Sequence, residues 1–482
     1  MEKRGKVAIV GGGVAGASVA LVLGALRIDV TLFEAGESLV SGPPMCHLHA
    51  GGNLYREISD EQCLRLLRES IEFVRLYPDI IDYRPTVIAV PVEDSGSPET
   101  LLPRLKLLQQ EYEKLIALDP ENAVLGASEA YYRLYGREDL ERLRDDSDKP
   151  EPRSFDEWMV PVAKGVDLDR IQYPLVLVQE FGINMFRLGA TATLGLQEME
   201  NGTLLMQTTV EHIEVEHDGS GWILSYKRNG KEKKETFDYL INAAGYRSGM
   251  IDAMLGFSIP RFVEFKAAYV TQWRENRQQW PEIVFHGERG TPRGMAQFTP
   301  YPGGYFQLHG MTKTITLFED GLVRCDEAGK RPKLDAFFIR KLEEGWSEEE
   351  VRERTEAAIA HVARFIPAFH SAEVASKPLY GAQQIPGDDP DLRAAEVSFE
   401  GERYARCEIV KASSVLAMSD AIADRLAALG CLEREGLDRE RIFNSLKGLG
   451  EAELSRHAEA LCVARGYPKA LASRTVERLR SV

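Results

Sequence analysis

Cysteines are few in this sequence, and their spacing forms no pattern. The six are Cys46, Cys63, Cys325, Cys407, Cys431 and Cys462, with no C-x-x-C pair and no zinc-type spacing. We therefore predict no metal site. Scattered cysteines of this kind are typical of a reducing cytoplasm, where each thiol is expected to be a small buried apolar side chain.

No uninterrupted apolar run approaches the roughly 20 residues that a membrane-spanning helix needs. The basic residues 1–6 precede an apolar stretch and so imitate a secretion signal. Five glycines interrupt that stretch by position 24, and Asp29 and Glu34 follow with no convincing cleavage site. The expected location is the cytoplasm, with peripheral contact to the inner face of the membrane as an open alternative.

An excess of positive charge is also missing. The chain has 59 Lys and Arg against 75 Asp and Glu, a net charge of −16. This charge repels phosphate backbones and argues against nucleic acid as a partner. With 482 residues, 44% of them hydrophobic and 28% charged, the chain is expected to be a soluble globular protein of two or three domains.

The N-terminus carries the pattern around which the chain is organised. Residues 7–10 read as a buried parallel strand, residues 17–26 as a helix and residues 28–33 as a second strand. Between the first strand and the helix lies a G-x-G-x-x-G motif. Its glycines permit a tight turn, close approach of a pyrophosphate and close packing of helix on strand. The residues expected to line the phosphates are Gly11, Gly13, Val14, Ala15 and Gly16.

An acidic residue ends the second strand. Glu34 lies 23 residues after Gly11, about where a carboxylate accepts hydrogen bonds from an adenosine ribose, and Ala35 follows it. An acid at this position argues against the 2′-phosphate of NADP. The motif alone leaves NAD and FAD both open.

The remaining chain alternates between helical and strand patterns. Helices are predicted over residues 60–77, within 99–147, over 333–365 and over 413–429, the last with Ser413 or Ser414 as N-cap. Strands are predicted at 87–92, 174–179 and 237–241, in an alternating region from 201 that contains an Asn229-Gly230 hairpin turn, and within 260–320. Residues 145–154 read as a linker, residues 379–391 as turn-rich and the tail from 432 as helical.

Four stretches resemble the FAD-dependent oxidoreductases of the D-amino-acid-oxidase and glycine-oxidase superfamily. They are the opening strand-helix-strand, the His49-Ala50-Gly51 loop, Thr209-Val210 with the INAAG run at 241–245, and residues 381–385 with the VKASS run at 410–414. Within the superfamily the chain looks most like the branch of malate:quinone oxidoreductases and L-2-hydroxyglutarate dehydrogenases. Two departures stand out: a longer glycine- and alanine-rich signature around the flavin is absent, and Gln383 replaces an arginine that is usual in the fourth stretch.

The resemblance implies FAD as the cofactor, because distant elements return to the nucleotide site. The cofactor-binding residues that it adds are His49, Ala50, Gly51, Val210, Ala244, Gly245, Lys411, Ala412, Ser413 and Ser414. In related proteins a similar His-Ala-x-Gly loop carries covalently attached flavin, which makes attachment at His49 an open alternative to simple contact.

The expected fold class is α/β, with a discontinuous Rossmann-like FAD-binding domain and a second α+β substrate domain on a mostly antiparallel sheet. We assign residues 1–80, 175–255 and 371–430 to the FAD-binding domain. Residues 81–174 and 256–370 form the substrate domain, and residues 431–482 form a helical C-terminal extension.

Three residues are candidates for catalysis. His309 has a pKa suited to accept a hydroxyl proton, although an exposed strand histidine is an equal alternative. His49 is expected to orient substrate or contact the flavin. Arg187 could clamp a substrate carboxylate through its planar fork, against the alternative of a structural salt bridge. Tyr301 and Tyr305 are weaker candidates for the substrate cavity.

These features predict an FAD-dependent enzyme that oxidises a small 2-hydroxy acid by hydride transfer to flavin and passes the electrons to a quinone or another acceptor. Oxidation of an amino acid or secondary amine is the first alternative, and a flavin-binding subunit without catalysis is the second. The basic residues 469–480 of the tail suggest at most a peripheral membrane contact.

Overall fold

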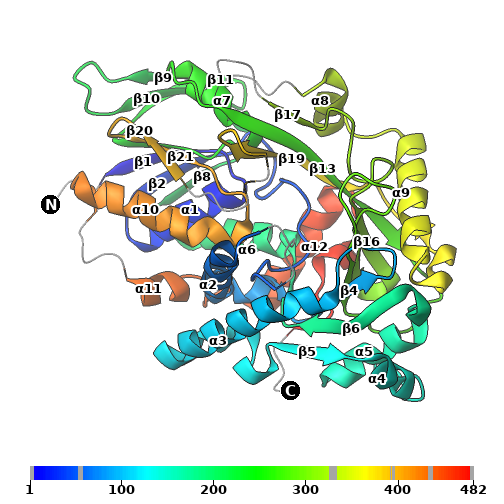
Figure 1. The fold of residues 1–482 in the computed structure, drawn as a ribbon. Coiled ribbons are helices and arrows are strands. Elements are labelled where there is room, and N and C mark those ends of the chain that lie inside the picture. The colour runs from blue at the N-terminus through cyan, green and yellow to red at the C-terminus, as the bar shows by residue number, and fades with distance from the viewer. Residues whose placement is uncertain are drawn as a thin grey trace.

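The structure is a computed structural model, and it describes residues 5–52, 58–324, 334–390, 392, 397–432 and 438–477. Cys325 and the end of the basic tail lie outside these ranges. Two sheets organise the described residues, and Figure 1 shows them on opposite sides of the molecule, with helix α12 (Glu451–Ala464) between them.

The first sheet contains the N-terminal strand. Its order is β20 (Val397–Glu400), β21 (Tyr404–Cys407), β12 (Tyr239–Asn242), β1 (Lys6–Val10), β2 (Asp29–Phe33) and β8 (Gly202–Leu205). All neighbours in it are parallel except β20 and β21. The sheet thus unites strands that lie almost 400 residues apart, as the prediction of a discontinuous Rossmann-like domain requires.

Both faces of the first sheet are covered. Val7 and Ile9 pack in one apolar core with helices α1 (Val14–Ala25) and α10 (Val415–Ala428). Ala8 and Val10 point to the other face, because side chains alternate along a strand, and pack against a three-stranded sheet. That sheet consists of β9 (Thr208–Val215), β10 (Trp222–Arg228) and β11 (Lys231–Phe237).

The predicted hairpin turn between β10 and β11 is confirmed. Asn229 has a φ of 51° and Gly230 a φ of 74°, and positive φ at both central residues is the geometry of a two-residue hairpin turn.

The second sheet is long and mostly antiparallel. Among the described strands its order is β17 (Leu322–Arg324), β13 (Arg261–Gln272), β16 (Tyr305–Gly310), β15 (Ala296–Tyr301), β14 (Glu282–Phe285), β4 (Thr86–Pro91), β6 (Ile171–Val178) and β5 (Tyr132–Tyr135). Strands β18 (Glu373–Val374) and β19 (Leu379–Pro386) also pair with β13. Only β14 and β4 run parallel to each other.

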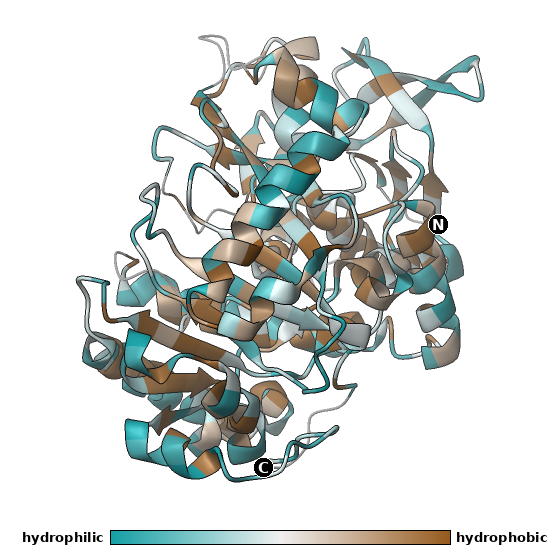
Figure 2. Ribbon diagram, turned by 90° about the vertical axis from the view of Figure 1, so that its right-hand side faces the viewer, coloured by the Kyte–Doolittle hydropathy of each residue, from teal (hydrophilic) through white to brown (hydrophobic). Residues whose placement is uncertain are grey.

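One face of the second sheet is apolar and covered by helices. These are α4 (Arg137–Leu143), α5 (Phe155–Gly165), α8 (Ala336–Glu343) and α9 (Glu348–Ala363), which share a core with the sheet. Figure 2 shows the result on this side of the molecule, where brown strands lie beneath helices with teal outer surfaces. The predicted second domain on a mostly antiparallel sheet matches this architecture.

Several local predictions differ from the structure. Residues 379–386 were expected to be turn-rich and part of the FAD-binding domain, but they form β19, which eight paired residues join to β13. Helix α3 (Leu102–Leu118) was expected in the substrate domain, but its buried face, with Leu105 and Leu108, packs in the core of the first sheet. Strand β5 interrupts the stretch that was expected to be helical. Contacts with distant parts of the chain determine the structure of all three segments, and a local sequence pattern does not predict such contacts.

Three helices complete the nucleotide-binding side. Helix α2 (Asp60–Leu76) lies beside α10, α7 (Ser248–Met254) follows β12, and α6 (Met185–Glu198) packs on α1 and α12. Among its described residues, the tail is helical at α11 (Arg439–Asn444) and α12, followed by a short 3-10 turn at Lys469–Ala472. Within the described part of the chain, every helix is too short or too polar to cross a membrane.

Candidate active site

The glycines between β1 and α1 fill two different structural needs. Gly11 has a φ of 105°, and a Cβ on it would lie 2.4 Å from the carbonyl oxygen of Ala243. A Cβ on Gly16 would lie 1.9 Å from the carbonyl oxygen of Gly11. These two glycines are therefore required by the chain itself. Gly13 differs, because no atom lies within 4 Å of the position that its Cβ would take.

The start of α1 is prepared for an anion. Gly13 is its N-cap and provides no side-chain hydrogen bond, and the first N–H groups of a helix have no partner within the helix. The helix dipole adds positive potential at this end. Val14 and Ala15 are only half-buried, so the open space at Gly13 continues over the first turn.

The Glu34 carboxylate holds the turn in place. Its Oε2 accepts a hydrogen bond from the N–H of Gly12 at 2.6 Å, and its Oε1 accepts one from Gly36 at 2.6 Å. Each carboxylate oxygen has a second lone pair. Glu34 can therefore also accept hydrogen bonds from the ribose hydroxyls that its sequence position predicts. Ala35 lies between Glu34 and Gly36 in the chain.

The residues from the third stretch lie beside the same turn. The N–H of Ala243 donates to the carbonyl oxygen of Val10 at 2.8 Å, which brings Ala244 and Gly245 next to Gly11. Val210 packs in the same apolar cluster as Val10 and Phe33. The structure thus brings together residues that are more than 200 positions apart, as the resemblance predicts.

Helix α2 supports both remaining cofactor segments. A Cβ on Gly51 would lie 2.7 Å from the carbonyl oxygen of Cys63 in α2. Further along α2, Glu69 accepts a hydrogen bond from Ser414 Oγ at 2.6 Å. The Ala50-Gly51 segment and the Lys411-Ala412-Ser413-Ser414 segment therefore rest on one helix.

The expected N-cap position is confirmed at Ser414, although its side chain makes no capping hydrogen bond. Ser414 is the N-cap residue of α10 by position, but its hydroxyl bonds to Glu69 and not to the helix. The Ser413 Oγ is buried without a hydrogen-bond partner among the described residues. A buried hydroxyl of this kind is costly unless a bound group satisfies it.

These observations fit a bound FAD. The open space at Gly13, the free helix start and Glu34 suit the adenosine and pyrophosphate part, while Ser413 offers a polar atom for a group farther along. The fit depends on residues from four separate stretches, which a mononucleotide or NAD site does not require.

The second sheet turns a polar face towards this region. In β14, β15 and β16, alternate residues point away from the apolar core that the helices cover. These residues, which we call the polar face, are Glu282, Gln297, Thr299, Tyr301, Tyr305, Gln307 and His309. Tyr301 donates a hydrogen bond to Gln307 at 3.1 Å.

Residues 42–52, the histidine loop, lie over the polar face. A Cβ on Gly381 of β19 would lie 2.6 Å from the backbone nitrogen of Pro43. His47 Nδ1 lies 2.5 Å from Glu282 Oε1. The loop therefore lies between the nucleotide-binding side and the polar face, and it connects the two halves of the site.

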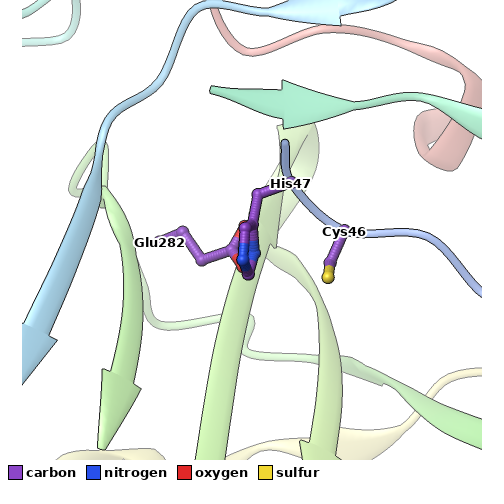
Figure 3. A group of neighbouring side chains, drawn as sticks. All are labelled: Cys46, His47 and Glu282. Atoms are coloured by element: carbon purple, nitrogen blue, oxygen red, sulfur yellow. The ribbon is translucent and has the colours of Figure 1, made fainter. Parts of the chain in front are cut away.

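A group of polar and ionisable side chains, the buried cluster, lies under the loop: Cys46, His47, Arg84, Glu282 and Gln297. Arg84 donates to Glu282 and, at 3.2 Å, to the carbonyl oxygen of Cys46. Gln297 Nε2 donates to Glu282 at 2.6 Å. In the view of Figure 3 the His47 ring lies between Glu282 on one side and Cys46 on the other.

Mutual charge stabilises the ionised forms in the buried cluster. Burial disfavours the Glu282 carboxylate, but the charges of His47 and Arg84 outweigh it and lower the pKa to about 2. Burial also opposes the His47 imidazolium, but Cys46 and Glu282 raise its pKa well above its usual value. His47 is therefore protonated at neutral pH and is a poor proton acceptor at rest.

His309 is in the opposite state. Burial first, and then the charge of Lys266, lower its pKa to about 4, so the imidazole is neutral at neutral pH. Its Nδ1 lies 3.3 Å from the carbonyl oxygen of Ala267. Because a carbonyl only accepts, we assign the proton to Nδ1, which leaves Nε2 with a lone pair. His309 can therefore accept a proton.

A charged trio lies beside His309: Glu264 and Lys266 of β13, and Arg289 between β14 and β15. Glu264 pairs with Arg289 at 2.7 Å and with Lys266 at 3.4 Å, so the trio carries a net charge of +1. Glu264 lies directly opposite Gln383 in the β13–β19 ladder. Opposite Gln383, where the resemblance expects an arginine, β13 thus presents the Glu264 carboxylate with two basic partners.

Arg187 lies away from the polar face. Its side chain is 2% exposed and donates to Glu451 at 2.8 Å, to Ser455 at 3.0 Å and to the carbonyl oxygen of Asp79 at 2.5 Å. These contacts join α6 to α12 and use the guanidinium fork completely. Arg187 thus forms a structural salt bridge, which was the alternative to a catalytic function. It does not lie where it could clamp a substrate carboxylate at the polar face.

His49 lies next to the buried cluster, with its ring 4.7 Å from that of His47. The sequence predicts His49 as a site residue, but it does not predict the partners of His47. Glu282, Arg84 and Gln297 were missed entirely, although the alternation in β15 and β16 was visible. The contacts of His47 with Glu282 and Gln297 join residues that lie 235 and 250 positions apart in the chain.

Comparisons with known proteins agree with this geometry. A family model described as DAO, FAD dependent oxidoreductase, matches residues 6–150. No curated protein sequence matches the chain. Glycine oxidase from Geobacillus kaustophilus has a similar structure, with a TM-score of 0.54 and 14% identity over 88% of this chain and 95% of that chain.

Two further solved structures share the fold. L-proline dehydrogenase from P.horikoshii has a TM-score of 0.57 at 14% identity, covering 93% of this chain and 99% of that one. L-α-glycerophosphate oxidase from Mycoplasma pneumoniae, with FAD bound, has a TM-score of 0.56 at 14% identity, covering 89% and 95%.

The fold and the site define a dinucleotide-dependent redox enzyme. The family model of FAD dependent oxidoreductases that matches residues 6–150 agrees with FAD as the cofactor, and the solved structures share the fold. A flavin-binding subunit without catalysis, the second alternative from the sequence, is therefore set aside.

Proposed function

We propose that this enzyme oxidises a small 2-hydroxy acid at the polar face and passes the electrons to a quinone or another acceptor. FAD, when bound, supplies the acceptor for the hydride. The observation that carries the proposal is the neutral His309 beside a charged trio with a net charge of +1.

Alcohol oxidation needs a group that takes the hydroxyl proton. The Nε2 of His309 has a free lone pair by our assignment, because Nδ1 donates to Ala267. A pKa near 4 makes His309 a weak base alone. An anionic substrate beside it would raise that pKa, since opposite charge favours the imidazolium. The base therefore gains strength when substrate binds.

The charged trio supplies the attraction for a carboxylate. Lys266 and Arg289 both pair with Glu264, and the three charges together sum to +1. Lys266 points to the same side of β13 as Ala268, the side on which His309 lies. A small molecule with a carboxylate next to its hydroxyl could engage both groups.

Amine oxidation is the competing function. Several structures of the same fold are named for amines or amino acids, among them the glycine oxidase and the L-proline dehydrogenase. A neutral amine has no hydroxyl proton, so it can lose hydride without a base. His309 would then have no proton to accept. The malate:quinone oxidoreductase and L-2-hydroxyglutarate dehydrogenase branch agrees better with the site and is part of the proposal.

The test is anaerobic reduction of the purified, FAD-loaded protein. We expect the flavin absorbance to bleach with malate, 2-hydroxyglutarate or another 2-hydroxy acid, and to persist with glycine, proline and other amino acids. His309→Gln should slow the bleaching by about 100-fold or more, the usual range for loss of a general base. Bleaching by amino acids alone would overturn the proposal.

A second buried histidine provides the control. His361 in α9 also has a lowered pKa, and its Nε2 donates a hydrogen bond to the carbonyl oxygen of Gly294, 2.8 Å away. It packs on the helix-covered side of the second sheet, away from the polar face. His361→Gln should leave the rate of bleaching per bound flavin unchanged.

A further inference from the structure

The Cys46 thiol lies in a surrounding of hydrogen-bond donors. The Sγ of Cys46, the ring nitrogen of His47 and the carboxylate of Glu282 all lie within 4.8 Å of one another. The charge of His47 and polar contacts with His47 and Gln297 lower the pKa of the Cys46 thiol. Figure 3 shows that the three side chains come from the histidine loop and from β14.

Such a trio of sulfur, nitrogen and oxygen also suggests a divalent cation, with one ligand atom from each residue. The donors around it argue against a metal. Glu282 accepts hydrogen bonds from His47, Gln297 and Arg84, so its oxygens face N–H groups. A cation would have to displace them and lie next to the Arg84 guanidinium. The cluster therefore stabilises anions.

Cys46 differs from the other described cysteines. Burial opposes its thiolate, but the charge and hydrogen bond of His47 and the amide of Gln297 leave its pKa lowered. Burial raises the pKa of Cys63, Cys407 and Cys462. Cys46 is also half-buried, whereas these three are fully buried. Cys431 is half-buried as well and provides a comparison at equal exposure.

We propose that Cys46 is a modification site, a nucleophilic thiolate held by His47 and Gln297 that is oxidised reversibly by hydroperoxides. The sulfur attacks one oxygen of hydrogen peroxide, and the O–O bond breaks as the new S–O bond forms. The thiolate loses two electrons, hydroxide leaves, and the product is a sulfenic acid. Hydrogen peroxide comes from solution, so the proposal does not depend on the substrate or on the electron acceptor.

The positive partners make this chemistry specific to one site. His47 holds the thiolate by its charge, and Glu282 holds the imidazolium of His47 in turn at 2.5 Å. Gln297 donates to both anions of the cluster. Thiolates with donors and cations around them are the cysteines that oxidants and alkylating agents attack first.

The first test is alkylation of the full-length protein with iodoacetamide at several pH values, followed by peptide mass spectrometry. We expect Cys46 to react about tenfold faster than Cys431 at pH 6, because its lowered pKa gives it the larger fraction of thiolate. Equal rates at Cys46 and Cys431 would overturn the proposal.

Two variants test the donors. Gln297→Leu removes one hydrogen bond and should slow the Cys46 reaction at low pH, with Cys431 unaffected. His47→Asn removes the charge and should slow it more. If His47→Asn fails to fold, the Gln297→Leu result still decides, because an unchanged low-pH rate in that variant contradicts the role of the donors.

The second test is oxidation. Protein exposed to hydrogen peroxide and then to dimedone should carry the dimedone adduct on Cys46, and Cys46→Ser should carry none. Absence of the adduct on Cys46 contradicts the proposal. So does a stoichiometric metal ion that co-purifies with the protein and blocks alkylation of Cys46 until a chelator removes it.

Discussion

At the scale of single residues, the glycines of the nucleotide turn are not equivalent. Gly11 and Gly16 are needed because backbone atoms lie where a side chain would be. Gly13 has a φ of −64° and a ψ of −176°, which any residue can adopt, and open space beside it. Its glycine is explained by a ligand and not by the fold.

Gly13→Ala should therefore separate binding from stability. The methyl group fits the protein without strain but occupies the space where a pyrophosphate approaches the backbone. We expect the denaturation midpoint of the FAD-free protein to stay unchanged and FAD affinity to fall about tenfold or more, ~1.4 kcal/mol. Flavin titration and chemical denaturation measure the two quantities.

Gly16→Ala is the matched contrast. Its methyl group would collide with the Gly11 carbonyl oxygen, and such overpacking typically costs about 1–3 kcal/mol. It should weaken both stability and FAD binding. A Gly13→Ala protein as unstable as Gly16→Ala would contradict the assignment.

The titration of His309 predicts the response of the protein to acid. In the unfolded chain His309 takes a proton near pH 6.5, but in the folded protein it resists protonation down to about pH 4. Below pH 6.5 the unfolded state thus binds more protons, and stability falls as pH is lowered towards 4, by at most ~1.4 kcal/mol per unit. Denaturation midpoints across this range should decrease more steeply for the parent than for His309→Gln.

At the scale of elements, α6 and α12 are joined by charge as well as by packing. The Arg187 side chain is 2% exposed, and burial and the nearby Arg474 both lower its pKa. Glu451 pairs with both arginines, at 2.8 and 3.0 Å. Without this carboxylate, two neighbouring cations would be left without their acidic partner.

Glu451→Gln tests this arrangement. Because charged hydrogen bonds contribute about 1.5–3 kcal/mol, we expect a clear loss of stability in chemical denaturation. The rate of substrate reduction per bound flavin should stay within about twofold, since the pair lies away from the polar face. A rise in KM for the carboxylate substrate without loss of stability would instead support the clamp that the sequence suggested.

The sequence predicts local elements well and long-range pairing poorly. The strand-helix-strand around Gly11, the Asn229-Gly230 turn and helix α2 follow from spacing that any reader can see. The sequence does not predict strand β19, because Gly381 and Pro386 suggest a turn. The segment becomes a strand through its pairing with β13. The sequence does not identify Glu282 as a site residue, because its function depends on a contact with His47, which lies 235 positions away in the chain.

At the scale of the whole molecule, the C-terminal tail reaches the centre of the site. Val476 donates its N–H to Asp82 at 2.8 Å, and Thr475 donates its hydroxyl to the same carboxylate at 2.6 Å. Asp82 pairs with Arg84 at 3.3 Å, and Arg84 pairs with Glu282 of the buried cluster. One chain of charged contacts thus runs from the tail to His47.

A truncation after Gly466 should loosen this connection. Asp82 would lose two hydrogen bonds, worth about 3 kcal/mol or more together. Asn184 would also lose the carbonyl oxygens of Leu471 and Ser473, to which its amide donates. We expect lower stability in denaturation. We also expect faster alkylation of Cys46 at pH 10, above the ordinary thiol pKa of about 8.5, where a gain in access raises the rate even if the shift of its pKa is lost.

Removal of residues 478–482 alone is the control for this truncation, because it leaves every contact of Thr475 and Val476 with Asp82 in place. That shorter deletion should match the parent in stability and in alkylation rate. If the long truncation also matched the parent in stability and in alkylation rate, the tail would be bound to the surface without stabilising the buried cluster. Loss of stability with unchanged Cys46 alkylation would show that Asp82 and Arg84 hold their positions alone. Only a change in both quantities fits a tail that stabilises the site through Asp82 and Arg84.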